Sequence, residues 1–181
     1  MSWVDLELVG KVQRALGRRG VKAVLCGSAV LALFNLLEEG MESKDVDLML
    51  LVAPEQSPLI NLDLYLEVAD ELGLEVEFGL YQFSLIYVKQ GSKPLELMYP
   101  VMDVDLPSEL RGELVEVRGV CCLSPYAVIV HKAMAGSSYL SGVKWSAVDL
   151  KELRRTVELL KDEGLKYIVL ERLRGEGVSL D

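Results

Sequence analysis

Apolar positions along the chain follow two different periods, and these periods separate predicted helices from predicted strands. Residues 3–18 carry an apolar side chain at every fourth position, which is the spacing of one helical face. A mostly apolar run at 21–25 predicts a short buried strand, whereas the Ala- and Leu-rich residues 28–39 predict a helix. Residues 45–52 begin with an alternation of acidic and apolar residues, which predicts a second strand.

The remainder of the chain divides into a strand-rich stretch and a helical stretch. We predict a helix at 61–72, strands at 74–78, 82–89, 95–99 and 113–117, and helices at 124–134, 146–160 and 165–173. Ser124 is an N-cap followed by proline, and Ser146 is expected to cap the next helix. The predicted fold class is therefore α/β (α+β): a mixed β-sheet domain at 1–119 with helices packed on it, followed by a C-terminal helical segment at 120–181.

A Gly-Ser pair stands where the first predicted strand passes into a helix. Gly27 has no side chain and Ser28 opens the helix, so free N–H groups gather at a place that suits a phosphate. Asp45 and Asp47 lie two residues apart, so their carboxylates share one face of the second strand while Val46 points to the core. Two hard oxygen ligands beside a phosphate site predict nucleotide binding through Mg²⁺.

A third carboxylate is expected on a later strand, and two residues compete for that place. Glu96 is preferred over Glu77, because it lies mid-strand between leucines, where an acid without a role is costly. Asp103 and Asp105 repeat the spacing of the first acidic pair. They lack a glycine-to-helix turn before them and run into a proline, so we interpret them as part of a loop.

Three further residues carry reactive groups, and each has a structural interpretation. Cys26 precedes the glycine and could be a nucleophile, but a cysteine in a predicted strand is more commonly a small buried hydrophobic residue. His131 interrupts an apolar helix and is expected in the core or at its rim. Lys132 either reaches a bound triphosphate or extends its ammonium group to solvent along an apolar surface.

Charge and composition limit the partners of the chain. The net charge of −9 over 181 residues argues against a surface that coats nucleic acid, while leaving room for a local patch that contacts one RNA end. No uncharged run reaches the ~18 residues needed to cross a membrane, and the first residues lack the pattern of a secretory signal. Three cysteines without disulfide or zinc spacing fit a reducing compartment. We expect a soluble, cytoplasmic protein.

The order strand, Gly27-Ser28, helix, and strand with Asp45 and Asp47 resembles the nucleotidyltransferase superfamily that includes DNA polymerase β and kanamycin nucleotidyltransferase. That superfamily carries a third acid on a later strand between apolar neighbours, and Glu96 fits this position. The resemblance implies a nucleotidyltransferase fold.

The C-terminal half is similar to the abortive-infection type transferase toxins and their relatives. In that group a Ser-Pro-capped helix ends in lysine, as at Lys132, and a Lys-Asp pair opens the next helix, as at Asp149. Val148 stands where the group usually has the lysine of that pair.

The resemblance implies a metal-dependent transfer of NMP from an NTP to a hydroxyl on an RNA end, a protein side chain or a small molecule. Gly27, Ser28 and Lys132 would bind the nucleotide. Asp45 and Asp47 would bind Mg²⁺ (or Mn²⁺), with Glu96 completing a second metal site and taking the proton of the attacking hydroxyl. The alternative is a non-catalytic protein of this fold that acts by binding a partner, such as a toxin–antitoxin component.

Overall fold

A single mixed β-sheet forms the centre of the computed structural model, which describes residues 3–79, 84–100 and 105–181. Its seven strands lie in the order β3-β4-β5-β2-β1-β7-β6. The pairs β2–β5 and β1–β7 are parallel, and the other neighbours are antiparallel. The strands are β1 (Ala23–Cys26), β2 (Val46–Leu50), β3 (Glu75–Phe78), β4 (Ser84–Val88), β5 (Leu95–Met98), β6 (Leu114–Val117) and β7 (Val120–Leu123). The mixed sheet and its helices confirm the predicted fold class.

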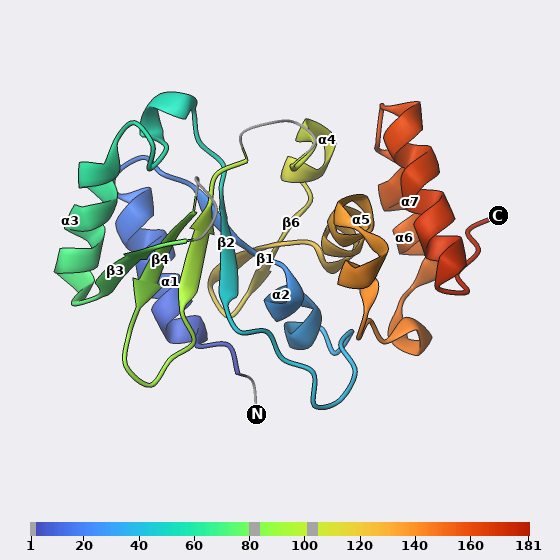
Figure 1. Cartoon of the computed structure of the whole chain (residues 1–181), viewed down its shortest axis with the longest axis horizontal. Coiled ribbons are helices and arrows are strands. Elements are labelled where there is room, and N and C mark those ends of the chain that lie inside the picture. The colour runs from blue at the N-terminus through green and yellow to red at the C-terminus, as the bar shows by residue number, and fades with distance from the viewer. Residues whose placement is uncertain (1–2, 80–83, 101–104) are drawn as a thin grey trace.

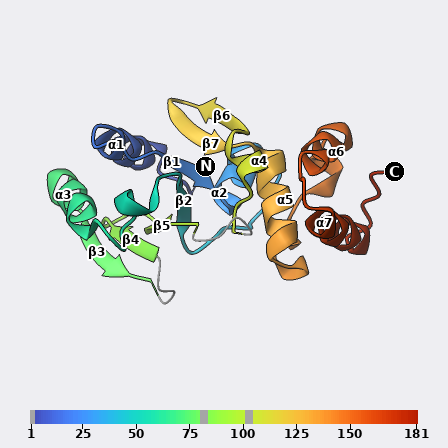
Figure 2. The same cartoon turned by 90° about the horizontal axis from the view of Figure 1, so that it is seen from above.

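The helices form two groups (Figures 1 and 2). Helix α1 packs on β1 and β7 and against α3, which packs on β3; α2 packs on β1 and β2 and lies between the sheet and α5, which is grouped with α6 and α7. The helices are α1 (Leu6–Gly17), α2 (Ser28–Leu33), α3 (Leu62–Leu72), α4 (Ser108–Arg111), α5 (Pro125–Ala135), α6 (Leu150–Glu158) and α7 (Glu163–Gly175). Short 3₁₀ turns occupy Pro54–Gln56, Ser137–Leu140 and Trp145–Ala147. None of the helices in the described part of the chain is long and apolar enough to cross a membrane.

The prediction of a helix at 28–39 is wrong in length, because α2 ends at Leu33. Asn35 takes a left-handed conformation with φ of 56°, which asparagine tolerates better than most residues. The backbone N–H of Leu36 donates to the carbonyl of Leu31 at 2.8 Å, and that of Asn35 donates to Ala32 at 3.2 Å. This is the Schellman pattern of a helix end, with asparagine in the place usually taken by glycine.

The sheet extends four residues beyond the predicted end of the sheet domain at residue 119. β6 and β7 form a hairpin whose turn residues, Arg118 and Gly119, both have positive φ, as a tight type I′ turn requires. β7 then pairs with β1 in the middle of the sheet. The strand at 120–123 was missing from the predicted elements, so the segment 120–181 is not helical from its start; its separation as a domain stays a prediction.

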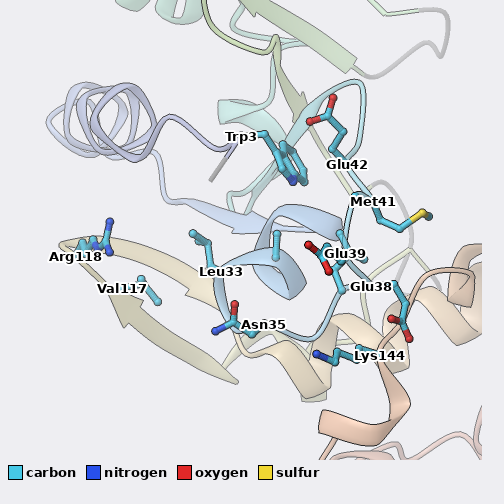
Figure 3. Close-up of a pocket in the computed structure, with 13 residues that line it drawn as sticks. Trp3, Leu33, Asn35, Glu38, Glu39, Met41, Glu42, Val117, Arg118 and Lys144 are labelled. Carbon is cyan, nitrogen blue, oxygen red and sulfur yellow. The ribbon is translucent and has the colours of Figure 1, made fainter. Parts of the chain in front are cut away.

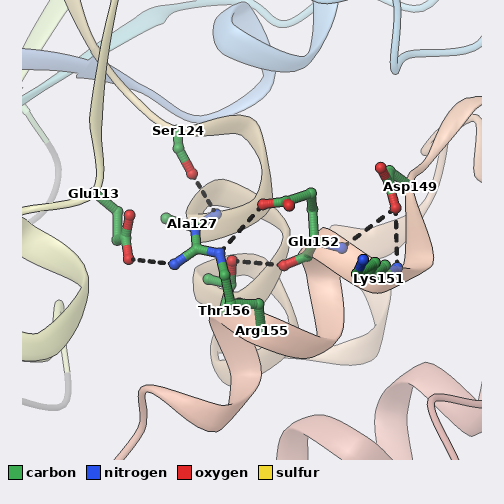
Figure 4. A network of polar contacts seen from close by, with 8 residues as sticks. All are labelled: Glu113, Ser124, Ala127, Asp149, Lys151, Glu152, Arg155 and Thr156. Atoms are coloured by element: carbon green, nitrogen blue, oxygen red, sulfur yellow. Dashed lines mark hydrogen bonds and ion pairs between the residues drawn. The ribbon is translucent and has the colours of Figure 1, made fainter.

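The N-caps of the C-terminal helices correct a second boundary. Ser124 accepts a hydrogen bond from Ala127 N, as the sequence predicts. Ser146 does not cap α6. Asp149 does so instead, accepting from the backbone N–H groups of Lys151 and Glu152 (Figure 4), and α6 starts at Leu150. An ionised carboxylate at an N-cap satisfies free N–H groups and also suits the positive end of the helix.

Candidate functional site

Gly27 forms the junction between β1 and α2 in a conformation that favours glycine. Its φ of 67° and ψ of −158° place it outside the regions open to most residues. A Cβ atom at this position would lie 2.4 Å from the Oδ2 atom of Asp47, closer than non-bonded atoms approach. The missing side chain therefore makes room for the carboxylate of Asp47, in addition to any approach by a ligand.

The strand register brings Asp47 and Glu96 side by side. They are direct partners in the parallel pair β2–β5, and residues paired in register project from the same face, with strands about 4.8 Å apart. Their neighbours Val46, Leu48 and Leu97 point the other way and are buried. Two carboxylates thus stand together on one face of the sheet, as the sequence predicts for Asp47 and its preferred partner.

Glu77 lies on the same face but not beside Asp47. It pairs with Ile86, which in turn pairs with Glu96, so one intervening strand separates the two glutamates. Asp45 precedes β2, and its negative charge acts on Asp47. Asp103 falls outside the described residues. Asp105 lies near His131 of α5 and does not belong to the group of Asp47 and Glu96.

Lys132 brings a positive charge from α5 to this face. Its Nζ atom donates a hydrogen bond to Ser28 Oγ at 3.0 Å, joining the helical segment to the Gly-Ser junction. Burial lowers the pKa of Lys132, and the charge of Asp47 opposes that shift. The ammonium group therefore points into the site instead of extending to solvent.

The electrostatics of this cluster strain the ionised form of Asp47. Burial, followed by the charge of Glu96, raises the pKa of Asp47 to about 7, with Lys132 acting in the opposite direction. Two partly buried carboxylates that repel one another form a favourable environment for a cation. Burial also raises the pKa of Cys26 well above its ordinary value. Cys26 is fully buried, so the thiol is a core residue, as expected, and not an activated nucleophile.

The donor set of Asp47 and Glu96 fits Mg²⁺ or Mn²⁺ in one particular way. Among the residues that the structure describes, no group of three His, Cys, Asp or Glu side chains is arranged to hold a metal ion. Mg²⁺, however, is commonly held by one or two carboxylates together with substrate phosphates and water. The two carboxylates fit a metal that arrives with a nucleotide better than one held by protein ligands alone.

A separate pocket of about 690 Å³ lies between α2, the loop after it and the β6–β7 turn (Figure 3). Trp3, Glu42, Arg118 and Lys144 are among its lining residues, whereas Asp47, Glu96 and Lys132 are not. Its charges are mixed in sign and spread around the rim.

A contact that supports the Lys132 region was not predicted from the sequence. Arg172 of α7 donates to the carbonyls of Ala133 and Met134 at the end of α5, at 2.6 and 2.5 Å. The residues are about 40 positions apart, and α7 was predicted only as a short helix at 165–173. A basic residue near its C-terminal end was the only available signal.

Comparison with known proteins identifies the family of this chain. A family model described as "Nucleotidyl transferase of unknown function (DUF2204)" matches residues 5–175. The chain belongs to this family. The nucleotidyltransferase superfamily predicted from the Gly-Ser and acidic motifs is thereby confirmed. The closer similarity to abortive-infection toxins stays a prediction.

The chain is also similar to solved structures. An antigenic nucleotidyltransferase-like protein from Paracoccidioides brasiliensis is 14% identical with a TM-score of 0.55, covering 94% of this chain and 88% of that one. The antibiotic-resistance factor ANT(2'')-Ia is 16% identical with a TM-score of 0.49, covering 98% of this chain and 95% of that one. The first similarity supports the nucleotidyltransferase fold. No curated protein matches the chain significantly.

Proposed function

We propose that this nucleotidyl transferase family member transfers NMP from an NTP to a hydroxyl acceptor in a reaction that depends on Mg²⁺ or Mn²⁺. One observation carries the proposal. Asp47 and Glu96 stand in register on neighbouring parallel strands, Asp47 lies against the Gly-Ser junction, and Lys132 donates to Ser28 at that junction. Carboxylates, a free backbone junction and a cation at one place are what a metal-bound triphosphate requires.

In this proposal the Gly-Ser junction and Lys132 bind the triphosphate. Helix α2 has only six residues, so its dipole is a weak anion site by itself. The backbone N–H groups at Gly27 and Ser28 would face the β- and γ-phosphates, and Lys132 would exchange part of its contact with Ser28 for a phosphate oxygen. Asp45 and Asp47 would hold the metal-bound side of the triphosphate.

The reaction proposed is an in-line displacement. The acceptor hydroxyl oxygen forms a bond to the α-phosphorus, the bond from that phosphorus to the bridging oxygen breaks, and pyrophosphate leaves. Glu96 receives the proton of the attacking hydroxyl. When bound, Mg²⁺ supplies charge neutralisation for the triphosphate and its leaving group. The pKa of Asp47 near neutrality means that the cation competes with a proton for this carboxylate.

Transfer of labelled nucleotide tests the proposal. The protein is incubated with each α-phosphate-labelled NTP, Mg²⁺ or Mn²⁺, and either total RNA or protein as acceptor. Wild type is expected to label one acceptor class, and Asp47→Asn or Glu96→Gln should lower the rate ~100-fold or more, as loss of a group that stabilises transition-state charge does.

Glu77→Gln is the matched control for Glu96→Gln. It removes one charge from the same face of the sheet, but beyond the intervening strand β4. Its activity should stay close to wild type. Equal loss in both variants would mean that net charge, and not the pair with Asp47, controls the rate.

Partner binding without catalysis is the second candidate function. It is favoured by the net charge of −9 and by Val148, which stands where the related toxins usually carry a lysine before Asp149. The two functions differ in ligand-dependent stability, because a bound nucleotide raises the melting temperature by mass action. Failure of all four NTPs, with either metal, to raise the melting temperature or transfer label would support partner binding.

A further inference from the structure

Helix α7 makes a specific contact with the end of α5. The last carbonyl groups of an α-helix have no partner within the helix, and basic side chains near that end can supply one. The Nη1 atom of Arg172 donates to the carbonyl of Ala133 at 2.6 Å and to that of Met134 at 2.5 Å. One guanidinium nitrogen thus joins α7 to two adjacent carbonyls of α5.

The turn of α5 that Arg172 contacts is the turn that carries Lys132. The backbone N–H of Gly136 donates to the carbonyl of Lys132 at 3.1 Å, and the Nζ atom of Lys132 donates to Ser28 Oγ at 3.0 Å. A continuous chain of contacts therefore runs from Arg172 through the last turn of α5 to the Gly-Ser junction.

The end of α5 lacks the left-handed cap that commonly closes a helix. Gly136 follows the helix with φ of 157°, an extended conformation and not the left-handed one that closes many helices. The chain then enters the short turn Ser137–Leu140. By contrast, α7 is anchored by Val169 and Leu173, which are both fully buried. Arg172 lies between these anchors and is held by them at the end of α5.

We propose that Arg172 is a positioning residue: by capping the last turn of α5 it holds the Lys132 ammonium group at the Gly-Ser junction. The proposal rests on the proposed function for the role of Lys132 toward a nucleotide. It adds that the site is complete only when α7 is docked.

Chemical labelling of lysine tests the position of Lys132 without any nucleotide. The metal-free protein is treated briefly with an amine-acylating reagent, and the labelling rate of each lysine is measured by mass spectrometry. Arg172→Met should raise the rate at Lys132 by about tenfold relative to the exposed Lys151, because a released side chain gains solvent access. Arg172→Lys keeps one cationic donor and should restore part of the protection. An unchanged Lys132 rate in folded Arg172→Met would overturn the proposal.

Arg174→Met is the matched control on the same helix. Arg174 pairs with Glu171 and Asp181, and its ion pairs within the described residues do not involve α5. Its removal should leave the labelling of Lys132 as in wild type. Equal exposure of Lys132 in this variant would indicate general loosening of α7 and would contradict a specific role for Arg172.

A double-mutant cycle on nucleotide affinity separates positioning from a general structural role. Arg172→Met should weaken binding of the Mg²⁺–NTP complex by about 3- to 10-fold in the wild-type background, and not further in Lys132→Met, because coupled residues are non-additive. Equal losses in both backgrounds would overturn the proposal. If wild type binds no NTP, the proposed function fails, while the labelling result still decides whether Arg172 positions Lys132.

Discussion

Two polar clusters join the sheet to the C-terminal helices, and they differ in how their charges are balanced. The site cluster consists of Ser28, Asp47, Glu96 and Lys132, and it lies partly buried against the sheet. The surface network consists of Glu113, Glu152 and Arg155, with Arg155 bonded to Glu113 at 3.1 Å and to Glu152 at 3.2 Å (Figure 4).

The pKa shifts in the two clusters have opposite consequences for stability. In the surface network the contacts of Arg155 with Glu113 and then Glu152 raise its pKa, so that the charged form is favoured. In the site cluster burial raises the pKa of Asp47 and lowers that of Lys132, so that the charged forms are disfavoured. Of the two clusters, only the site cluster holds charged groups that lower the stability of the folded protein. This pattern is expected where a charged ligand is bound.

The largest effect on stability is expected at Gly27. Gly27→Ala should lower the free energy of unfolding by about 2–4 kcal/mol, since it combines strain at positive φ with a steric conflict at Asp47. Gly40→Ala is the control, because Gly40 has a φ of 80° and open space around it; its cost should be about 1 kcal/mol. Chemical denaturation measures both.

The conflict with Asp47 can be isolated in a second background. When Asp47→Ala is already present, the cost of Gly27→Ala should fall to that of Gly40→Ala, because only the backbone strain remains. A cost that does not change would show that the glycine is needed for its conformation alone.

An intermediate effect is expected from the charge of Asp47. Its pKa is raised from 3.8 to about 7 in the folded protein, so folding takes up a proton between these values and stability falls as pH rises from about 4 to 7. Asp47→Asn should therefore raise the melting temperature of the metal-free protein by about 3–6 °C at pH 8 and have little effect near pH 4.

Glu77→Gln controls for the loss of one negative charge from the same face. A gain in melting temperature at pH 8 as large in Glu77→Gln as in Asp47→Asn would show that the net charge of this face, and not the carboxylate of Asp47, lowers stability. If Asp47→Asn changes the melting temperature equally at pH 4 and pH 8, the carboxylate of Asp47 is not strained in the folded protein.

The smallest effect is expected in the surface network. Arg155→Met should lower the free energy of unfolding only slightly, because exposed ion pairs contribute little and are screened by salt. The difference from wild type should shrink in 1 M NaCl, and nucleotide transfer should be unchanged. A clear loss of transfer would mean that the two clusters are coupled through α6.

The placement of Asp47 and Glu96 on one face of the sheet could be predicted from the sequence, because the alternation of side chains along a strand is a local rule. Residues 45–52 fix which side chains share a face, and the leucines around Glu96 fix its orientation. The same local reasoning missed the end of α2, where Asn35 replaces the expected glycine as a terminator. It also missed β7, which has only four residues and lies directly before the cap of α5.

Contacts between distant parts of the chain had no such local rule. Because β2 pairs with β5, Glu96 and not Glu77 lies beside Asp47. The order of strands in a sheet cannot be predicted from the sequence of either strand alone. The bond from Arg172 to α5 likewise depends on how two helices dock, for which side-chain periodicity specifies a buried face but no individual partner.

The late position of β7 in the sequence has a consequence for the newly made protein. β1 lies between β2 and β7, so one edge of β1 has no partner until synthesis has passed Leu123. During that interval a nascent chain exposes an apolar strand edge of the kind that promotes association with other chains. Because the closing pair joins residues nearly 100 positions apart, slow folding and a dependence on chaperones during translation are expected for this molecule.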